Sequence, residues 1–255
     1  MAHISYSELK IWAECPFKHK LMYIDKIKGF VGNEYTAFGS AIHYLCEHAV
    51  VGSVEQEDYQ ELFNHSFRKE LKKIEVTKHD LVVEMLSQAE NIGLHILPEL
   101  EKHFGSYEVF SVEEKLFEKV QDFKLDNYNF KGFIDLVIKT PDGKYHVIDW
   151  KTCSWGWDRE KRNDRLTTYQ LTLYKKFFCQ KHNIDPNMVE THFALLKRTA
   201  KSNNVEIFRV TSGPRKSNNA SSLLLKALIN IHRQIKIKNR LSCDRCEFRK
   251  TANCP

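Results

Sequence analysis

The sequence predicts an α/β fold in which a mixed β-sheet is flanked by helices, and three observations indicate this. Residues 131–151 read as a β-hairpin, because two apolar runs are joined by the turn Pro141-Asp142-Gly143. Residues 78–104 hold a helical period of apolar side chains, and residues 166–181 form another helical segment. Residues 188–198 and 205–211 then read as two further strands that extend the sheet.

Each strand of the hairpin carries an acid, Asp135 or Asp149, where a buried sheet favours β-branched residues. Lys151 follows two residues after Asp149, and the alternation of a strand puts these two side chains on one face. Two carboxylates beside a lysine suit a hard divalent cation, with the ammonium left to act on a water or phosphate. A solvated Asp149–Lys151 pair is the alternative, but an unpaired acid among apolar neighbours is costly. We therefore expect a metal site on this hairpin.

The remaining elements follow from local signals. Residues 5–8 form a capping box, which predicts that a helix begins there. Apolar periodicity predicts further helices at 37–51, 54–74 and 221–240. We expect strands at 107–117 and 120–125, and a loop at 212–217.

The hairpin resembles the core of the PD-(D/E)XK nucleases, in which G-x-(I/V)-D precedes (I/V)-(D/E)-x-K. Here these motifs are Gly-Phe-Ile-Asp at 132–135 and Ile-Asp-Trp-Lys at 148–151. Two more motifs resemble the RecB-like branch: a helical G-x-x-(I/L)-H motif that ends in His43, and Q-x-x-x-Y from Gln170 to Tyr174. The resemblance implies a restriction-endonuclease-like mixed sheet flanked by helices.

The resemblance also implies roles for individual residues. Mg²⁺ or Mn²⁺ would be held by the side chains of His43, Asp135 and Asp149 and by the backbone carbonyl of Trp150. Lys151 would orient or deprotonate the attacking water, and Gln170 and Tyr174 would position the phosphate. The branch often carries a glutamate on the strand beside Asp135, for which we prefer Glu113 over Glu114. We expect the eleven histidines other than His43 to be packing or surface residues.

Seven cysteines, an odd number, argue against a disulfide framework and for a reducing compartment. The C-x-x-C motif of Cys243 and Cys246, followed by Cys254, is a strong signal for a metal or cluster. One interpretation is a zinc site completed by His232 or a nearby acid. The resemblance offers another, because CRISPR-adaptation and AddB-type nucleases bind a [4Fe–4S] cluster through one early and three C-terminal cysteines. Cys15, Cys243, Cys246 and Cys254 occupy those positions in order.

Charge is distributed unevenly along the chain. Residues 191–255 hold 14 Lys+Arg against 3 Asp+Glu, although the whole chain has a net charge of only +6. A basic C-terminal third suggests a polyanionic partner such as nucleic acid, with a solvated basic surface as the alternative. After the hairpin, aromatic residues lead into a basic segment that we expect to contact DNA through Arg159, Lys161, Arg162 and Arg165.

The resemblance as a whole implies one nuclease domain over residues 1–255. It would comprise a helical part at about 5–104, a nuclease core at about 107–211, and a C-terminal helix with the cysteine cluster at about 217–255. We expect a Mg²⁺- or Mn²⁺-dependent DNA exonuclease, whose N- and C-terminal segments are joined by the Fe–S cluster. The alternatives are a non-catalytic DNA-binding subunit of a recombination, repair or replication complex, or a zinc-stapled nucleic-acid-binding module.

The expected substrate is DNA that is single-stranded or has free ends, with a helicase or recombination partner. No apolar run is long enough for a membrane span, and residues 1–17 lack the apolar core of a signal peptide. We therefore expect a cytoplasmic protein of a bacterial, archaeal or phage-infected cell.

Overall fold

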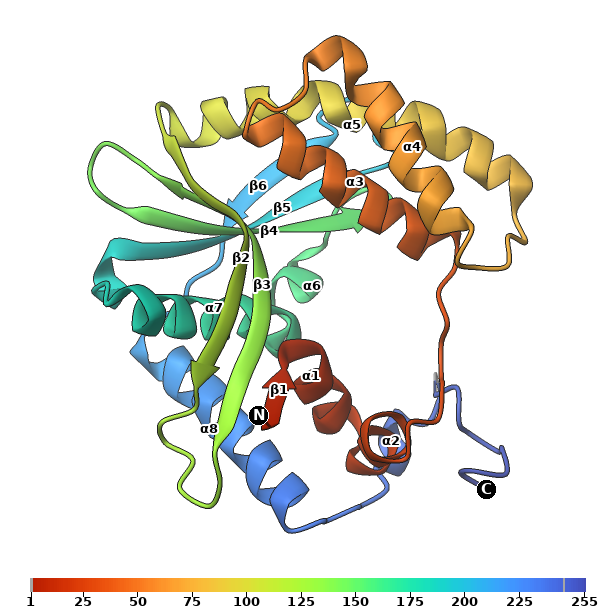
Figure 1. The fold of residues 1–255 in the computed structure, drawn as a ribbon, viewed down its shortest axis with the longest axis vertical. Coiled ribbons are helices and arrows are strands. Elements are labelled where there is room, and N and C mark those ends of the chain that lie inside the picture. The colour runs from red at the N-terminus through yellow and green to blue at the C-terminus, as the bar shows by residue number, and fades with distance from the viewer. Residues whose placement is uncertain (1, 245) are drawn as a thin grey trace.

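The computed structural model describes residues 2–244 and 246–255, so Met1 and Arg245, which belongs to the C-x-x-C motif, lie outside the described residues. Within these residues a six-stranded mixed sheet forms the centre, and helices pack on both of its faces (Figure 1). Among the described helices, none combines the length and apolar character that a membrane span requires.

The sheet has the strand order β1-β3-β4-β5-β6, and β2 pairs with β3 outside this path. The pairs β1–β3 and β4–β5 are parallel, whereas β2–β3, β3–β4 and β5–β6 are antiparallel. The strands are β1 (Ala2–Ser5), β2 (Glu108–Lys119), β3 (Tyr128–Lys139), β4 (Tyr145–Cys153), β5 (Val189–Lys197) and β6 (Val205–Arg209).

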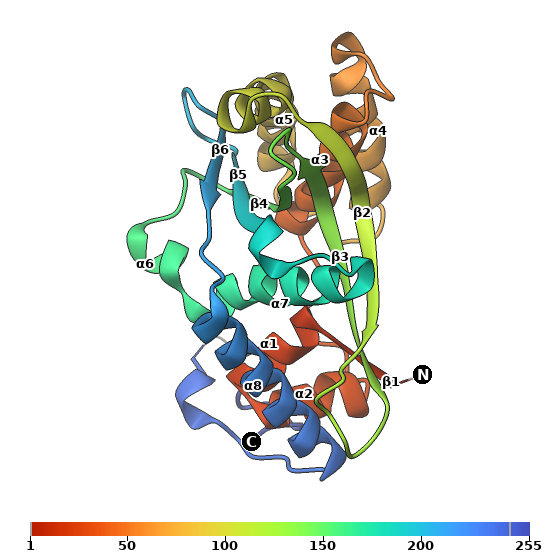
Figure 2. The same ribbon diagram turned by 90° about the vertical axis from the view of Figure 1, so that its left-hand side faces the viewer.

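Strand β3 has two different neighbours along one of its edges. β1 pairs with residues 128–131 of β3, and β4 pairs with residues 136–139. β2 pairs along the opposite edge, from Asn129 to Lys139. In the described chain, residues 132–135 therefore face a gap between β1 and β4. Figure 2 shows β2 and β3 as long strands that continue past β4 toward β1.

One face of the sheet packs against α3 (Glu34–Val50) and α5 (His79–Phe104), and α4 (Tyr59–Leu71) packs against these two helices on their outer side (Figure 2). A capping box starts α3, because the Asn33 side chain accepts from the Thr36 N–H and the Thr36 hydroxyl accepts from the Asn33 N–H. Phe38, Ile42 and Leu45 are fully buried along its inner side. A short 3₁₀ turn, η2 (Gln56–Asp58), leads into α4.

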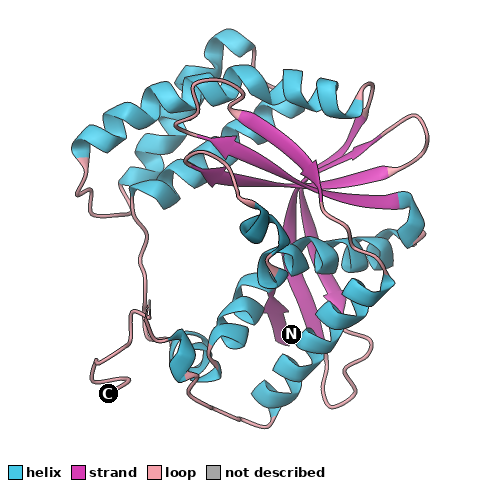
Figure 3. Ribbon diagram, turned by 180° about the vertical axis from the view of Figure 1, so that it is seen from behind, coloured by secondary structure: helices cyan, strands magenta, loops and turns pink. Residues whose placement is uncertain are grey.

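The other face packs against α1 (Tyr6–Glu14), α7 (Arg165–His182) and α8 (Pro214–His232) (Figure 3). α7 lies directly on the sheet, since Tyr169, Leu173 and Phe177 belong to the same buried cluster as Phe193 of β5. Two short elements flank α7, the helix α6 (Arg159–Asn163) and the 3₁₀ turn η3 (Pro186–Met188). The buried apolar surface of these two layers is the main force that holds helices and sheet together.

An early and a late segment of the chain meet beside α2 (Pro16–His19), which continues into a π-helical turn, η1 (Lys20–Ile24). The Asn239 amide and the Ser242 hydroxyl both donate to the Glu14 carbonyl, each at 2.9 Å. Lys18 Nζ lies 3.0 Å from a Glu247 carboxylate oxygen. In Figure 1 the last segment, which contains η4 (Arg240–Ser242), accordingly runs next to α2.

Several expected elements are wrong. Residues 120–125 form no strand but a turn, in which the Phe123 N–H donates to the Val120 carbonyl and both side chains are buried. The last helix begins at Pro214, within the expected loop, and ends at His232. Proline suits the first position of a helix because its missing N–H would be unpaired there anyway. β1 and α6 were not expected.

Candidate active site

The candidate site lies where β3 and β4 separate. Their pairing ends at Leu136 opposite Ile148, so the next residues in register, Asp135 and Asp149, face one another across the opening fork. One Asp135 oxygen, Oδ2, accepts a hydrogen bond from the Trp150 N–H at 2.7 Å. The carboxylate thus satisfies a backbone donor beyond the last paired residues, which holds Asp135 in place at the fork.

Asp149 is buried, with only 2% of its surface exposed. Its Oδ1 accepts a hydrogen bond from Gln170 Nε2 at 2.8 Å. Its Oδ2 forms an ion pair with Lys151 Nζ at 2.5 Å. Burial, together with the charge of Asp135, raises the pKa of Asp149 to about 6, although Lys151 acts in the opposite direction. A buried carboxylate opposite a second carboxylate fits a cation ligand.

His43 approaches the fork from α3. Its Nδ1 lies 3.7 Å from Asp135 Oδ1. Burial alone would lower the pKa of His43, but the negative charge of Asp135 raises it above its usual value. The imidazole and the two carboxylates therefore belong to one electrostatic cluster.

The side chains of the neighbouring residues Glu113 and Glu114 lie in different surroundings. Glu114 Oε1 binds Lys181 Nζ at 2.5 Å and His182 Nε2 at 2.9 Å, both on α7. Burial raises the pKa of Glu113, and so do the charges of Asp135, Glu47 and Asp149, which places Glu113 beside the fork. Its backbone has φ +47°, in the left-handed region that costs a non-glycine residue about 1 kcal/mol. The pairing of β2 with β3 skips Glu113 and Asp135.

At Glu113 and Asp135, the side chains of both β2 and β3 switch from one face of the sheet to the other. Before it, Ile134 of β3 lies in the core beneath α7, but Leu136, two residues later, lies in the core beneath α3–α5. On β2, Val112 packs on the α3–α5 side whereas Glu114 reaches α7. Regular alternation would keep residues two apart on one face. The site therefore sits where the sheet bends.

Gln170 and Tyr174 lie one turn apart on α7 and face the fork together. Gln170 Nε2, which donates to Asp149, also donates to the Tyr174 hydroxyl at 3.2 Å. Burial raises the pKa of Tyr174 far above its ordinary value, so its hydroxyl stays protonated. The Tyr174 ring packs so closely over Gly132 that a Cβ there would lie 2.8 Å from Tyr174 Cε1.

A cavity of about 690 Å³ opens beside Tyr174 and Gly132. It is lined by residues of β1, α1, η1, β3 and α7. Its walls combine aromatic and basic side chains, including Tyr6, Tyr23, Lys26, Lys131 and Phe133.

The model of the PD-(D/E)XK nuclease superfamily matches residues 3–252, nearly the whole chain. The chain belongs to this superfamily. Its motifs GFID and IDWK lie on β3 and β4, at the fork. PD-(D/E)XK nucleases use divalent metal ions, and the carboxylate oxygens at the fork are suitable ligands for such an ion.

One solved structure shares this fold, and a second aligns less closely. A protein from Eubacterium rectale described as a candidate exonuclease aligns with a TM-score of 0.64 and 14% identity, covering 100% of this chain and 90% of that one. A structure named SSO0001 aligns with a TM-score of 0.46 and 13% identity, covering 96% of this chain and 83% of that one. Among curated proteins, none matches the chain significantly.

Two further residues near the acids were not expected from the sequence. Glu47 lies one helical turn after His43, and that spacing alone could have indicated a shared face. Tyr6 of α1 is buried, and its hydroxyl has no hydrogen-bond partner among the described residues. Burial raises the pKa of Tyr6, as do the charges of Asp164, Tyr174 and Asp149. Tyr6 begins a helix distant in sequence, so no local signal marks it.

The four basic residues expected to contact DNA divide into two groups. Arg159, Lys161 and Arg165 are exposed on and after α6. Arg162 instead packs inward, where Nη2 lies 2.5 Å from Glu206 Oε1 and the guanidinium stacks over the Phe208 ring at 4.5 Å. Arg162 therefore holds α6 against β6.

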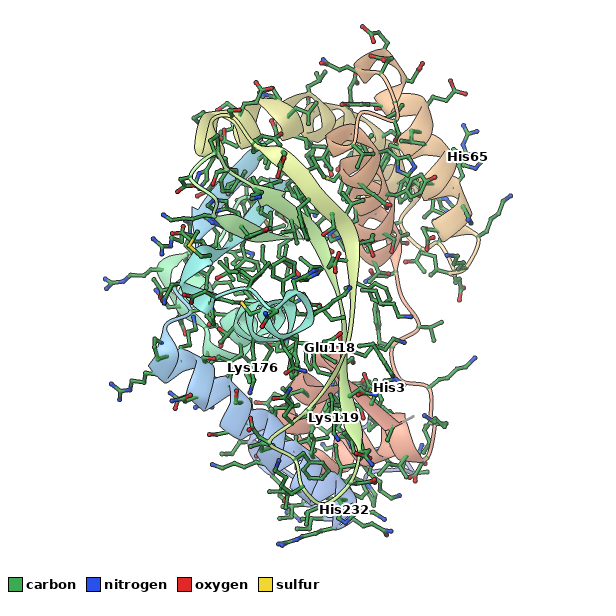
Figure 4. The ribbon with its side chains drawn as sticks, turned by 60° about the vertical axis from the view of Figure 1, so that its left-hand side comes forward. His3, His65, Glu118, Lys119, Lys176 and His232 are labelled. Carbon is green, nitrogen blue, oxygen red and sulfur yellow. The ribbon has the colours of Figure 1, made fainter. Side chains whose placement is uncertain are left out.

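The four cysteines expected to bind a cluster line one cavity of about 320 Å³, together with Phe17, Leu21 and Phe248. These cysteines are Cys15, Cys243, Cys246 and Cys254, and all four are half-buried thiols. His232, at the end of α8, packs against Phe123 and is not part of this cavity (Figure 4).

Proposed function

We propose that this chain is a Mg²⁺- or Mn²⁺-dependent DNA exonuclease of the RecB-like branch. The arrangement of Asp149 carries the proposal. This carboxylate is buried opposite Asp135, with an amide donor on one oxygen and a lysine ammonium beside the other. Such an environment is expensive for a purely structural acid, but it suits a ligand that must be fixed before a cation arrives.

His43, Asp135, Asp149 and the Trp150 carbonyl would hold the ion, with Glu113 beside them. The bound cation would polarise the scissile phosphate and acidify a water. Lys151, within 2.5 Å of Asp149, would orient that water and balance charge on the phosphate. Gln170 fixes Asp149 on one side and the Tyr174 hydroxyl on the other, so this pair would keep the phosphate aligned with the carboxylates.

The cavity beside Tyr174 supports a DNA substrate that is single-stranded or has a free end. Stacking of bases on aromatic rings and pairing of phosphates with lysines are general features of single-strand binding. Tyr23, Phe133, Lys26 and Lys131 provide both types of contact in this cavity, which Tyr174 also lines. Arg159, Lys161 and Arg165 would extend the basic surface, while Arg162 is already engaged with Glu206.

The shared cavity of Cys15, Cys243, Cys246 and Cys254 supports a [4Fe–4S] cluster at the junction of the chain ends. Asn239 also bridges this junction, because its N–H donates to Cys15 Sγ at 3.3 Å and its amide donates to Glu14. The cluster would reinforce contacts that the ends already make. A helicase or recombination partner and a cytoplasmic location remain part of the proposal.

The test is digestion of 5′- and 3′-labelled single- and double-stranded DNA with and without Mn²⁺. Asp149→Ala and Lys151→Ala should each lower the metal-dependent rate by about a thousandfold, since each removes several kcal/mol of barrier lowering. Asp122→Asn and Lys139→Met, an acid and a lysine away from the fork, are the matched controls and should cleave normally.

Release of single nucleotides from one labelled end would identify an exonuclease and its polarity. Wild-type activity in either site variant would refute the catalytic assignment. Binding of DNA without cleavage by the wild-type protein would favour the non-catalytic subunit instead. Stoichiometric zinc in place of iron would favour the zinc-stapled module.

A further inference from the structure

A second cluster of ligating side chains lies on the opposite face of the sheet from Asp149 and Lys151. It consists of His146 on β4 and of Glu190 and His192 on β5. One ligand atom from each of the three lies within 4.8 Å of the others. His146 and His192 are buried, with 7% and 3% of their surfaces exposed, and Glu190 is half-buried.

The two imidazoles already have the spacing that a transition metal requires. His146 Nδ1 lies 3.1 Å from His192 Nε2. Two nitrogens bound to one tetrahedral Zn²⁺, at about 2.0 Å each, lie about 3.3 Å apart. A small outward movement of the rings would therefore admit the ion between them in place of their mutual hydrogen bond.

Neighbouring groups orient each ligand toward this point. His146 Nε2 bonds to Thr140 Oγ1 at 3.1 Å, which leaves Nδ1 directed at His192. Glu190 Oε1 is held by Arg209 at 3.2 Å and by Lys144 at 3.6 Å, while its Oε2 lies 4.0 Å from His192 Nε2. Such outer contacts are what fix ligand geometry in metal sites.

The surroundings keep the two rings neutral and in place. Phe104 packs against both imidazoles, and the ring of His103 meets that of His192 edge-on at 5.5 Å. Burial lowers the pKa of His146 and lowers that of His192 to about 2, and neutral imidazole is the form that binds metals. His192 Nδ1 is buried and has no hydrogen-bond partner among residues 2–244 and 246–255, so packing alone does not satisfy this cluster.

We propose that His146, Glu190 and His192 form a binding site for a Zn²⁺-class transition metal, separate from the cation site at the fork. Two imidazoles and one carboxylate favour zinc or a neighbouring metal over Mg²⁺, which takes oxygen ligands. The ion would connect β4 to β5, the parallel pair on which Asp149 and Lys151 are mounted. The site does not depend on the proposed nuclease activity.

The experiment counts Zn²⁺ bound to the full chain by equilibrium dialysis after chelator treatment, in excess Mg²⁺ to occupy the fork. Wild-type protein should bind one more Zn²⁺ per chain than His192→Gln, whatever the cysteines bind. Glu190→Gln should weaken that site by more than about tenfold, because even outer-sphere partners are worth that much. His65→Gln, at an exposed histidine on the outer side of α4, should match wild type (Figure 4). Equal stoichiometry in wild type and His192→Gln would overturn the proposal.

A second measurement needs no variant, in case His192→Gln fails to fold. In wild-type protein with ¹⁵N-labelled imidazoles, a coupling between nitrogens across the His146–His192 hydrogen bond identifies the pair. One equivalent of Zn²⁺ beyond the cysteine sites should abolish that coupling and shift both rings. A coupling that persists in excess Zn²⁺ would show that the pair is a packing contact and would refute the site.

Discussion

Single residues at the fork are held by contacts that serve both the fold and the proposed chemistry. Asp135 accepts the Trp150 N–H, and Gln170 donates to Asp149, so neither carboxylate can rotate freely. Each acid keeps its second oxygen for another partner. Asp135 Oδ1 lies toward His43, and Asp149 Oδ2 lies beside Lys151. Because only 2% of the Asp149 surface is exposed, a cation bound beside it should lower the pKa of this carboxyl strongly.

The raised pKa of Asp149 predicts a pH dependence of stability in metal-free protein. The value is about 6 in the folded chain against 3.8 for an exposed aspartate. The stabilising effect of its proton is therefore fully present below about pH 3.8 and is lost as the pH rises through 6. Between pH 5 and 7 the free energy of unfolding should fall by about 1 kcal/mol more in wild type than in Asp149→Asn. Urea unfolding in EDTA measures this. An equal slope in the variant would contradict it.

Adjacent glutamates on β2 provide a matched pair for testing which one serves the site. Glu113→Gln should lower metal-dependent cleavage by about tenfold or more, since Glu113 lies beside the carboxylates. Glu114→Gln should leave cleavage intact and cost about 1 kcal/mol of stability, because it weakens contacts to Lys181 and His182. Rates and urea midpoints of the two variants separate the roles. The reverse pattern would assign the site to Glu114.

At the scale of elements, the site depends on how α7 rests on β3. Gly132 lets the Tyr174 ring approach the strand, and Tyr174 in turn supports Gln170. The gap between β1 and β4 leaves space for this approach, since no described strand pairs with residues 132–135 on that edge. A glycine of the G-x-(I/V)-D motif therefore acts through packing rather than through a special backbone angle.

Gly132→Ala should displace Tyr174 and reduce cleavage by about tenfold or more while the fold is kept. The new Cβ would meet Tyr174 Cε1 at 2.8 Å, and relieving that overlap should cost about 1–3 kcal/mol. Gly213→Ala, at the N-cap of α8, is the control, because its Cβ would meet no described atom within 4 Å. The control should cleave normally. Cleavage rates and melting curves decide, and full activity of Gly132→Ala would disprove the packing role.

Most elements could be predicted from the sequence because their signals are local. The turn at Pro141–Gly143, the cap before α1 and the periodicity of α5 each depend on a few neighbouring residues. The face change at Glu113 and Asp135 could not be predicted, because strand alternation assumes a flat ladder. The His146, Glu190 and His192 group was missed because its members are unremarkable until two parallel strands bring them together.

At the scale of the whole molecule, the chain closes on itself. The Phe17 N–H donates to the Ile237 carbonyl at 3.1 Å, and Asn239 and Ser242 bind the Glu14 carbonyl. These few polar contacts join segments more than 200 positions apart, and the four cysteines line the cavity between them. A cross-link at this point would close a loop of nearly the entire chain, which restricts the unfolded state strongly.

Cys15→Ala should release iron from anaerobically purified protein and lower its melting temperature by several degrees. The expected wild-type content is about four irons per chain, the number that a [4Fe–4S] cluster holds. Cys153→Ala, at the end of β4 and outside the cavity, is the control and should keep its iron. Iron analysis and thermal melting give the result. Full iron retention in Cys15→Ala would remove this residue from the ligand set.

The gap beside β3 also restricts where the chain can gain or lose residues during evolution. β1 and β4 set their registers with β3 independently, on either side of residues 132–135. Inserting or deleting one residue between Gly132 and Asp135 would leave the pairings with β1 and β4 intact but break the ladder with β2 on the opposite edge. It would also reverse the face of Gly132 relative to Asp135, since a shift of one position reverses the face of a strand. The turn at 120–127 and the hairpin loop at 140–144 carry no such restriction. Length differences among relatives should therefore accumulate in those loops and spare the four residues beside the fork.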